Sequence, residues 1–321
     1  MLKKTLLLTF LICPSLWSFT YDQHGILGLD YGPNISWTFA GNTPISFGQW
    51  LPQFTGSLDY NWIEPLGERL PYGEEIGFRE AFLRLQASIQ TSPFYGGFMV
   101  GMGLRPFKTN PQVEVRFLYQ STIYYNSNIE MVLADSTGGG SISDSWNADY
   151  VLDHVWSQEF SRVDFSQNFN VWVDFDFAFR SGSIMGLGGH FTLTDIQTKH
   201  DNKSYDYERN LPVFSRDYIF ELIFFHHIHL SDKWNFVYYL NGYQTGFLRN
   251  DDGTILKESL SYGKIMAGIN FQSENKLRSF TVTPGFWFRP KKGQYNGTLL
   301  QQFLIHLQYQ GRFSFPFRSR K

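Results

Sequence analysis

The sequence predicts an all-β protein, folded as a single antiparallel, up-and-down transmembrane β-barrel of about 12 strands, with about 14 as the alternative. Three observations predict this fold. Apolar and polar residues alternate along many long runs, and beyond the N-terminal segment no run is long and apolar enough for a membrane-spanning helix. In addition, short turns alternate with long loops, as they do in membrane barrels.

The composition excludes several other classes of protein. The 321 residues are 42% hydrophobic and 18% aromatic, which is too apolar for a disordered chain. A single cysteine excludes a disulfide scaffold. The formal net charge is -2, and lysines and arginines are scattered, so nucleic acid is not an expected partner.

Residues 1–18 are predicted to be a signal peptide. Lys3 and Lys4 form a short basic start, and the apolar residues 5–12 follow before Pro14 interrupts them. The alternative for this segment is a short buried core element. Export explains a basic chain start before an apolar run of this length better than a core element does.

The cleavage position stays open. Cleavage after Ser18 would leave Leu16, which is not small, at the third position back. A lipoprotein anchor at Cys13 is disfavoured because Ile12 stands where a small residue is needed. Residues 19–321 are then expected to form the barrel, and cleavage beyond Cys13 leaves an exported chain without disulfides.

The clearest alternation covers residues 163–179, where nearly every odd position is apolar and nearly every even position is polar. Residues 303–315 repeat the pattern near the C-terminus. Runs of this length exceed most strands of globular proteins and match tilted membrane-spanning strands. The apolar face could instead pack on a second sheet in a soluble sandwich, and periodicity alone does not separate the two.

Further strands are predicted along the rest of the chain. They cover residues 25–31, 35–39, 54–62, 80–90, 94–105, 113–125, 184–196, 218–230, 234–248, 260–273 and 277–289. With the two clearest runs the total is odd, whereas a barrel with both ends on one side of the membrane needs an even number. We therefore expect about twelve, with one early strand split or missed and the error most probable at 43–53 and 63–75.

The connections between these runs alternate in length. Short turns lie at 181–182, 231–232 and 273–276, and the intervening loops are long, at 126–162, 198–212, 250–257 and 290–297. Short turns on one rim and long loops on the other are typical of outer-membrane barrels, and Greek-key crossovers would not give this order. The short turn at 91–93 is the exception, because it falls on the long-loop side.

The end of the chain carries a family resemblance. The last strand ends Tyr309-Gln310-Gly311-Arg312-Phe313-Ser314-Phe315-Pro316-Phe317 and resembles that of bacterial outer-membrane β-barrel proteins, porins among them. The resemblance implies a Gram-negative-type outer membrane, contact with membrane lipid, and recognition of this strand by the outer-membrane insertion machinery. It departs at residues 318–321, which follow the aromatic residue that ordinarily ends such chains.

Charged residues of both signs are expected on the face of the strands that points away from lipid. They are Glu80, Arg84, Glu114, Arg116, Asp174, Asp176, Arg180, Glu221 and Lys264. Such residues can line a water-filled lumen that passes small polar solutes or ions, and they can equally form a closed plug of salt bridges. In a channel wall, Asp174 and Asp176 need no catalytic role.

The longest predicted loop, residues 126–161, holds six acidic residues and no lysine or arginine. Asp144, Asp149 and Asp153 are its central acids. Folded over the opening, this loop would attract cations. The alternative is a solvated external loop that contains a short amphipathic helix.

The histidine-rich segment at 226–231 offers two weak chemical signals. His227 and His229 share one strand face at a spacing that can hold a metal, although no third ligand is evident. His229 and Ser231 form a His-x-Ser sequence similar to that of outer-membrane phospholipases, but on the wrong rim and without an evident partner. No catalytic residue, metal or other cofactor is therefore predicted.

The predicted function is a porin-like channel for small hydrophilic solutes, with a possible preference for cations. The alternative is a barrel without a transport function, either a structural or adhesive surface protein or a lipid-acting enzyme. A continuous polar path past Asp174, Asp176 and Lys264 would favour the channel.

Overall fold

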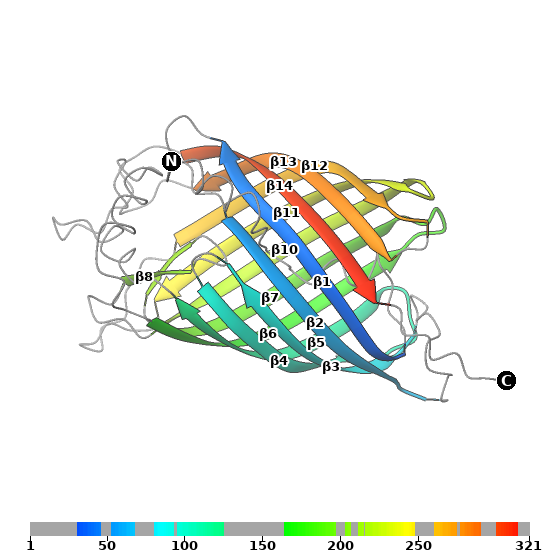
Figure 1. Ribbon diagram of the computed structural model, residues 1–321, viewed down its shortest axis with the longest axis horizontal. Helices are drawn as coiled ribbons and strands as arrows, with labels where there is room; N and C mark the ends of the chain where they lie inside the picture. The colour runs from blue at the N-terminus through cyan, green and yellow to red at the C-terminus, as the bar shows by residue number, and fades with distance from the viewer. Residues whose placement is uncertain are drawn as a thin grey trace, which may run out of the picture.

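The computed structural model describes residues 31–45, 53–67, 80–92, 95–124, 164–196, 203–206, 211–214, 216–247, 260–274, 277–289 and 300–313. Twelve of its strands form a closed barrel in the order β1-β14-β13-β12-β11-β10-β7-β6-β5-β4-β3-β2 (Figure 1). The prediction of an all-β barrel with about twelve strands is confirmed, and the alternative of about fourteen is wrong. Among the described residues, no helix is long and apolar enough to cross a membrane.

The barrel strands are mostly ten to sixteen residues long, as the alternating runs predict. Their bounds are β1 Gly32–Ile45, β2 Gln53–Pro65, β3 Phe82–Thr91, β4 Tyr95–Arg105, β5 Gln112–Tyr124, β6 Asp164–Ala178, β7 Ile184–Ile196, β10 Arg216–Ser231, β11 Trp234–Phe247, β12 Leu260–Gln272, β13 Arg278–Arg289 and β14 Leu300–Phe313.

Strand β1 resolves the odd number of predicted runs. The predicted run at 35–39 is the middle of this one strand, which continues to Ile45 and closes the barrel between β2 and β14. Trp37, for example, pairs with Leu58 on β2 and with Gly311 on β14. All of the predicted run at 25–31 except Tyr31 lies outside the described residues, and Tyr31 directly precedes β1.

Two short strands correct the prediction of a plain loop between β7 and β10. Strands β8 (Lys203–Asp206) and β9 (Leu211–Phe214) pair with each other in a separate two-stranded sheet. Four residues are too few to show a reliable alternation in the sequence.

The faces of the barrel are inverted relative to a soluble protein. On β6, Phe169, Val171 and Phe175 are exposed on the outside, whereas Asp174 and Asp176 are buried inside. The other strands repeat this arrangement, with exposed outer residues such as Leu85, Phe117, Leu187, Leu222, Ile265 and Leu307. An apolar exterior around a polar interior is the signature of a barrel surrounded by lipid, which excludes the soluble sandwich.

The two rims differ as the turn lengths predict. The turn at 179–183 and the turn at 232–233 connect their strands tightly. The start of β1 and the end of β14 lie at the same end of the barrel as these turns (Figure 1). We refer to this end as the short-turn end. Inside it, Tyr31, Ile63 and Phe82 form a small apolar cluster.

Candidate functional site

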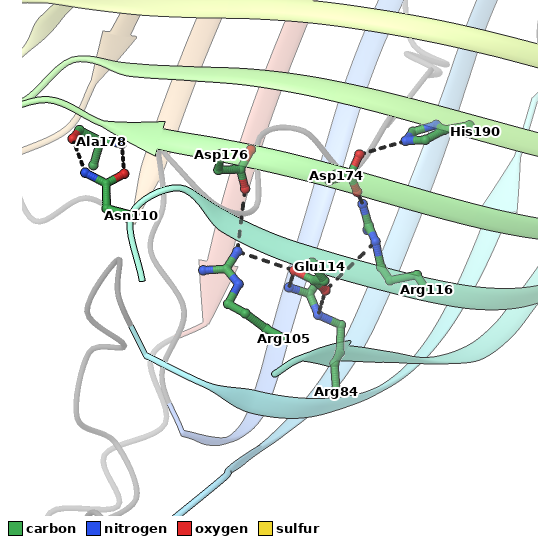
Figure 2. Close-up of polar contacts among 9 residues, drawn as sticks. All are labelled: Arg84, Arg105, Asn110, Glu114, Arg116, Asp174, Asp176, Ala178 and His190. Carbon is green, nitrogen blue, oxygen red and sulfur yellow. Dashed lines mark hydrogen bonds and ion pairs between the residues drawn. The ribbon is translucent and has the colours of Figure 1, made fainter. Parts of the chain in front are cut away.

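Half of the barrel wall carries a continuous group of charged side chains on its inner face. Figure 2 shows part of this group. It runs over β3, β4, β5, β6, β7 and β10, which are consecutive in the ring. We call this group the ladder. It consists of Arg84, Arg105, Glu114, Arg116, Asp174, Asp176, His190 and Glu221. None of these residues is more than 3% exposed.

The register of the strands brings the ladder residues together. Residues directly opposite each other on neighbouring strands point to the same face of the sheet. Hydrogen-bonded pairing therefore places one row of side chains around the inside of the wall, and Glu114 pairs with Asp174 in the next row. The first row contains Arg84, Gly103, Arg116, Trp172, His190 and Glu221.

Glu114 is the centre of the part of the ladder nearest the short-turn end. Arg84 Nε lies 3.2 Å from Glu114 Oε1, and Arg105 Nη2 lies 3.4 Å from Glu114 Oε2. Arg105 Nη2 is also 3.6 Å from Asp176 Oδ2. Two arginines from different strands thus converge on one buried carboxylate, and one of them reaches a second.

Asp174 is the centre of the other part. Arg116 Nη2 lies 2.6 Å from Asp174 Oδ2, and His190 Nε2 lies 2.9 Å from Asp174 Oδ1. On the far side of the same imidazole, His190 Nδ1 is 3.9 Å from Glu221 Oε2. Asn241 Nδ2 donates a hydrogen bond of 3.0 Å to the other oxygen of Glu221, which extends the polar contacts to β11.

Aromatic rings support the arginines from the side. The guanidinium of Arg105 lies 4.8 Å from the ring centre of Phe82, and that of Arg116 lies 4.7 Å from the ring centre of Trp172. Trp172 also stacks on His190, with centroids 4.5 Å apart. A desolvated cation over an aromatic face gains roughly 2 kcal/mol, so these rings help to fix the planes of the charged groups.

Two glycines on the inner face make room for the charges. A Cβ atom at Gly103 would lie 2.8 Å from Arg116 Cγ and 3.0 Å from Glu114 Oε1. At Gly186 it would lie 2.0 Å from the ring of Phe225 and 2.8 Å from Asp176 Oδ1. Residues without side chains at these points therefore permit large charged and aromatic groups on the neighbouring strands.

The ladder connects the strands of one wall through charged side chains, and the facing wall has a different lining. Its contacts join neighbouring or next-but-one strands and so follow the wall. The second wall, formed by β11, β12, β13, β14, β1 and β2, is lined mainly by uncharged polar side chains. Examples are Asn270, Thr281, Gln310, Thr38, Thr55 and Asn61.

Six of the nine sequence-predicted interior residues belong to the ladder. They are Arg84, Glu114, Arg116, Asp174, Asp176 and Glu221. Lys264 also lies inside the barrel, on β12, with its ammonium 5.1 Å from the ring centre of Tyr243.

Glu80 and Arg180 require a correction, because both lie beyond the ends of their strands. Glu80 precedes β3 and forms an ion pair of 3.4 Å with the exposed Lys108. Arg180 is exposed in the turn after β6. The alternation in the sequence continues a residue or two beyond the strand, so it does not show where the strand ends.

The sequence-based selection missed Arg105 and His190. Both follow from the same alternation, since Met102 and Leu104 face outward on β4 and Phe191 and Leu193 face outward on β7. Arg105 closes a strand whose inner face is otherwise mostly glycine, and a lone histidine attracts little notice. The alternation therefore places both residues inside the barrel, but nothing else in the sequence distinguishes them.

The histidine segment is divided between different environments. His227 is buried inside, and its Nε2 lies 3.1 Å from the hydroxyl of Tyr239. His229 is exposed near the turn after β6, where its backbone N–H donates to Ser183 Oγ. Among the described residues, no group of three His, Cys, Asp or Glu is placed to hold a metal. Ser231 is exposed beside a register shift at the end of β10.

Other predicted features fall outside the described residues. They are the signal peptide at 1–18 and the acidic loop at 126–161, which includes Asp144, Asp149 and Asp153.

No protein-family model and no curated protein matches the sequence. An outer-membrane channel from Pseudomonas putida F1 is similar in form, with 11% identity over 91% of this chain and 99% of that chain, and a TM-score of 0.44. The β domain of the Bordetella autotransporter BrkA shows 10% identity, coverage of 89% and 100%, and a TM-score of 0.39. Outer-membrane expressed OmpT of Vibrio cholerae shows 6% identity, coverage of 89% and 98%, and a TM-score of 0.41.

The chain is an outer-membrane β-barrel. A closed antiparallel ring with an apolar exterior, a polar interior and an even number of strands is the form in which proteins cross the Gram-negative outer membrane. Membrane lipid is therefore the partner of its outer surface.

Proposed function

We propose that the protein is a porin-like channel through which small hydrophilic solutes and ions cross the outer membrane. The second wall lines the path, and the ladder holds the other wall in shape. The observation that carries this proposal is the set of interior polar atoms that have no protein partner.

Water inside the barrel would provide hydrogen-bond partners for these atoms. Asn61 Oδ1, Asn168 Oδ1, Asn170 Nδ2 and Thr283 Oγ1 form no hydrogen bond within the part of the chain that the structure describes. A buried polar group left without any partner costs about 1–3 kcal/mol. The four groups lie on β2, β6 and β13 and so occur on both walls, which supports hydration across the interior.

The same residues limit what can pass. None of the four is more than 4% exposed, so the space beside them is narrow. Small ions and compact polar solutes fit such a path, whereas large solutes do not. Because the arginines and acids of the ladder are paired with each other, we propose that any cation preference comes from the acidic loop at 126–161.

A second candidate function is a closed barrel without transport, acting as a structural or adhesive surface protein or a lipid-acting enzyme. The burial of the ladder favours it, because a salt-bridged group of this size can also fill a lumen. In either case, we propose that the outer-membrane insertion machinery recognises β14, whose outward residues Leu307, Tyr309 and Phe313 alternate with polar ones.

Conductance separates the two candidates. The purified barrel, refolded and reconstituted in a planar lipid bilayer, should give discrete current steps in KCl. Thr283→Trp, which places a large ring on the second wall, should reduce the step size, whereas Asp232→Asn in an exposed turn should leave it unchanged. A correctly folded barrel that passes no current would reject the channel in favour of the closed barrel.

A further inference from the structure

A group of oxygen atoms on β2 and β3 lies outside the ladder and has no assigned role. It is centred on Asp59, whose side chain points into the barrel and is 3% exposed. Ser57 Oγ donates a hydrogen bond of 2.8 Å to Asp59 Oδ2, and the hydroxyl of Ser88 also bonds this carboxylate. Asp59 and Ser88 are directly opposite each other in the sheet.

Two amide oxygens lie one step further along the same inner face. Asn61 and Gln86 are cross-strand partners, two residues along from Asp59 and Ser88. They are 1% and 6% exposed, and neither Asn61 Oδ1 nor Gln86 Oε1 has a hydrogen-bond partner in the described chain. Same-face neighbours in a sheet are about 5–7 Å apart, so the side chains of Asp59, Ser88, Asn61 and Gln86 border one small volume. Ser57 lies on the far side of Asp59 from Asn61 and reaches the carboxylate only as a hydrogen-bond donor.

Within the described part of the chain, no basic side chain balances a charge on Asp59. The arginines of the ladder pair with Glu114, Asp174 and Asp176, and no described basic side chain forms an ion pair with Asp59. The two serines stabilise the carboxylate by donating hydrogen bonds, yet their oxygen lone pairs remain available. A buried carboxylate either takes up a proton or has a paired cation or a bound metal ion.

We propose that Asp59, Asn61, Gln86 and Ser88 form a binding site for a hard metal cation on the inner wall of the barrel, with Ser57 holding the Asp59 carboxylate by its hydrogen bond. Carboxylate, amide and hydroxyl oxygens are the ligands that such cations prefer. One negative charge with several neutral oxygens suits Na⁺, or a Ca²⁺ ion that keeps part of its water shell. The site borders the ladder, because Arg84 is the next residue to Gln86 on the inner face of β3, on the side away from Asp59. It does not depend on whether the barrel conducts.

Direct binding to the refolded full-length protein tests this site. The barrel is refolded in detergent without lipopolysaccharide, which itself binds cations, and equilibrium dialysis is carried out with ²²Na⁺ or ⁴⁵Ca²⁺ in choline chloride of constant ionic strength. One of the two ions should bind saturably with one site per barrel. If neither ion binds saturably, the proposal is overturned.

Two kinds of variant locate the site. Asp59→Asn keeps the shape but removes the charge, and it should weaken binding by at least about tenfold. Asp232→Asn removes an exposed carboxylate at the short-turn end and should bind as the unaltered protein does. Equal binding by the Asp59→Asn variant would place the ion elsewhere and overturn the assignment.

A third variant guards against misfolding. If Asp59→Asn does not give the heat-modifiable band of a folded barrel, Asn61→Leu combined with Gln86→Leu keeps the carboxylate and removes both amide oxygens. This double variant should also lose affinity. Unchanged affinity in it would show that the amide oxygens are not ligands and would contradict the site as proposed.

Discussion

Asp174 connects an arginine and a histidine in a place that water hardly reaches. Its carboxylate oxygens lie 2.6 Å from Arg116 Nη2 and 2.9 Å from His190 Nε2. Removing one member of a buried ion pair leaves the other charge uncompensated, which costs about 3–5 kcal/mol. The ladder is therefore most sensitive at this residue.

We expect Asp174→Asn to lower the free energy of unfolding by about 3–5 kcal/mol, measured by urea unfolding of the barrel in lipid vesicles. Asp176→Asn is the matched comparison, because its ion pair with Arg105 has the longer distance of 3.6 Å. It should cost less. Equal losses at both positions would mean that Asp174 does not bridge Arg116 and His190.

At the residue scale, the sequence determines whether a side chain faces the inside or the outside of the barrel, but not which side chain it contacts. Alternation alone puts Arg116 and Asp174 inside, because Val115, Phe117, Val173 and Phe175 flank them on the outside. Their pairing depends on the register of β5 against β6, which sets Glu114 opposite Asp174 and leaves Arg116 on the diagonal. That register is a tertiary property, so sequence alone left a water-filled lumen and a salt-bridged plug equally open.

The single strand shows the environment of the barrel most directly. Val171 lies in the middle of β6, on the outer face, between Phe117 of β5 and Phe191 of β7. A charged residue at the middle of a membrane-spanning strand costs about 2–4 kcal/mol, and this cost falls towards zero at the interfaces.

Val171→Arg should therefore reduce the free energy of unfolding by about 2–4 kcal/mol in lipid vesicles. Phe165→Arg, also outward but at the beginning of the same strand, should cost at most about 1 kcal/mol. Equal costs at both depths would contradict a strand that spans the lipid.

The alternation in the sequence did not predict the full strand where Pro and Gly interrupt it, and it did not predict strands that are very short. Pro33, Gly41 and Pro44 interrupt β1, so the sequence divides one strand of 14 residues into pieces. At β8 and β9, four residues each are too short for a period to be visible. The long strands β6 and β14 were predictable because lipid requires an apolar residue at almost every outward position.

At the scale of the whole molecule, closure depends on the seam between the first and last strands. Trp37 of β1 covers Gly311 of β14 and meets the ring of Tyr309 edge to face, with centroids 4.9 Å apart. A Cβ atom at Gly311 would lie 2.3 Å from the indole of Trp37. The indole of Trp37 can therefore pack on β14 at this point because Gly311 has no side chain.

Gly311→Val should destabilise the closed barrel by about 1–3 kcal/mol, the cost typical of overpacking. On a gel run without boiling, the folded band should be lost at a lower temperature. Gly242→Ala is the control, because a Cβ atom at Gly242 would meet nothing within 4 Å. If both variants melt alike, the packing of Trp37 does not hold the seam.

Ion selectivity is the property of the whole channel that the described interior does not dictate. The three arginines of the ladder face the carboxylates of Glu114, Asp174 and Asp176, so the fields of these six groups largely cancel at the distance of a passing ion. Glu221 and Asp59 are further acidic groups of the inner wall. The loop at 126–161, by contrast, carries six acids with no lysine or arginine. At physiological ionic strength such charges act over about 8 Å, so they influence permeation only if the loop lies at the opening.

Changing Asp144, Asp149 and Asp153 together to Asn should therefore lower the cation-to-anion permeability ratio, measured as the reversal potential in a KCl gradient across a planar bilayer. Folding should be unaffected, because the three residues lie outside the described strands of the barrel. The control changes Arg116 and Asp174 together to Met and Leu, which removes one charge of each sign from the ladder. Selectivity should stay the same in this control, since the net charge of the wall is preserved. If instead the loop variant keeps its selectivity and the ladder variant loses it, ions are sorted by the interior wall, and the paired charges do not cancel.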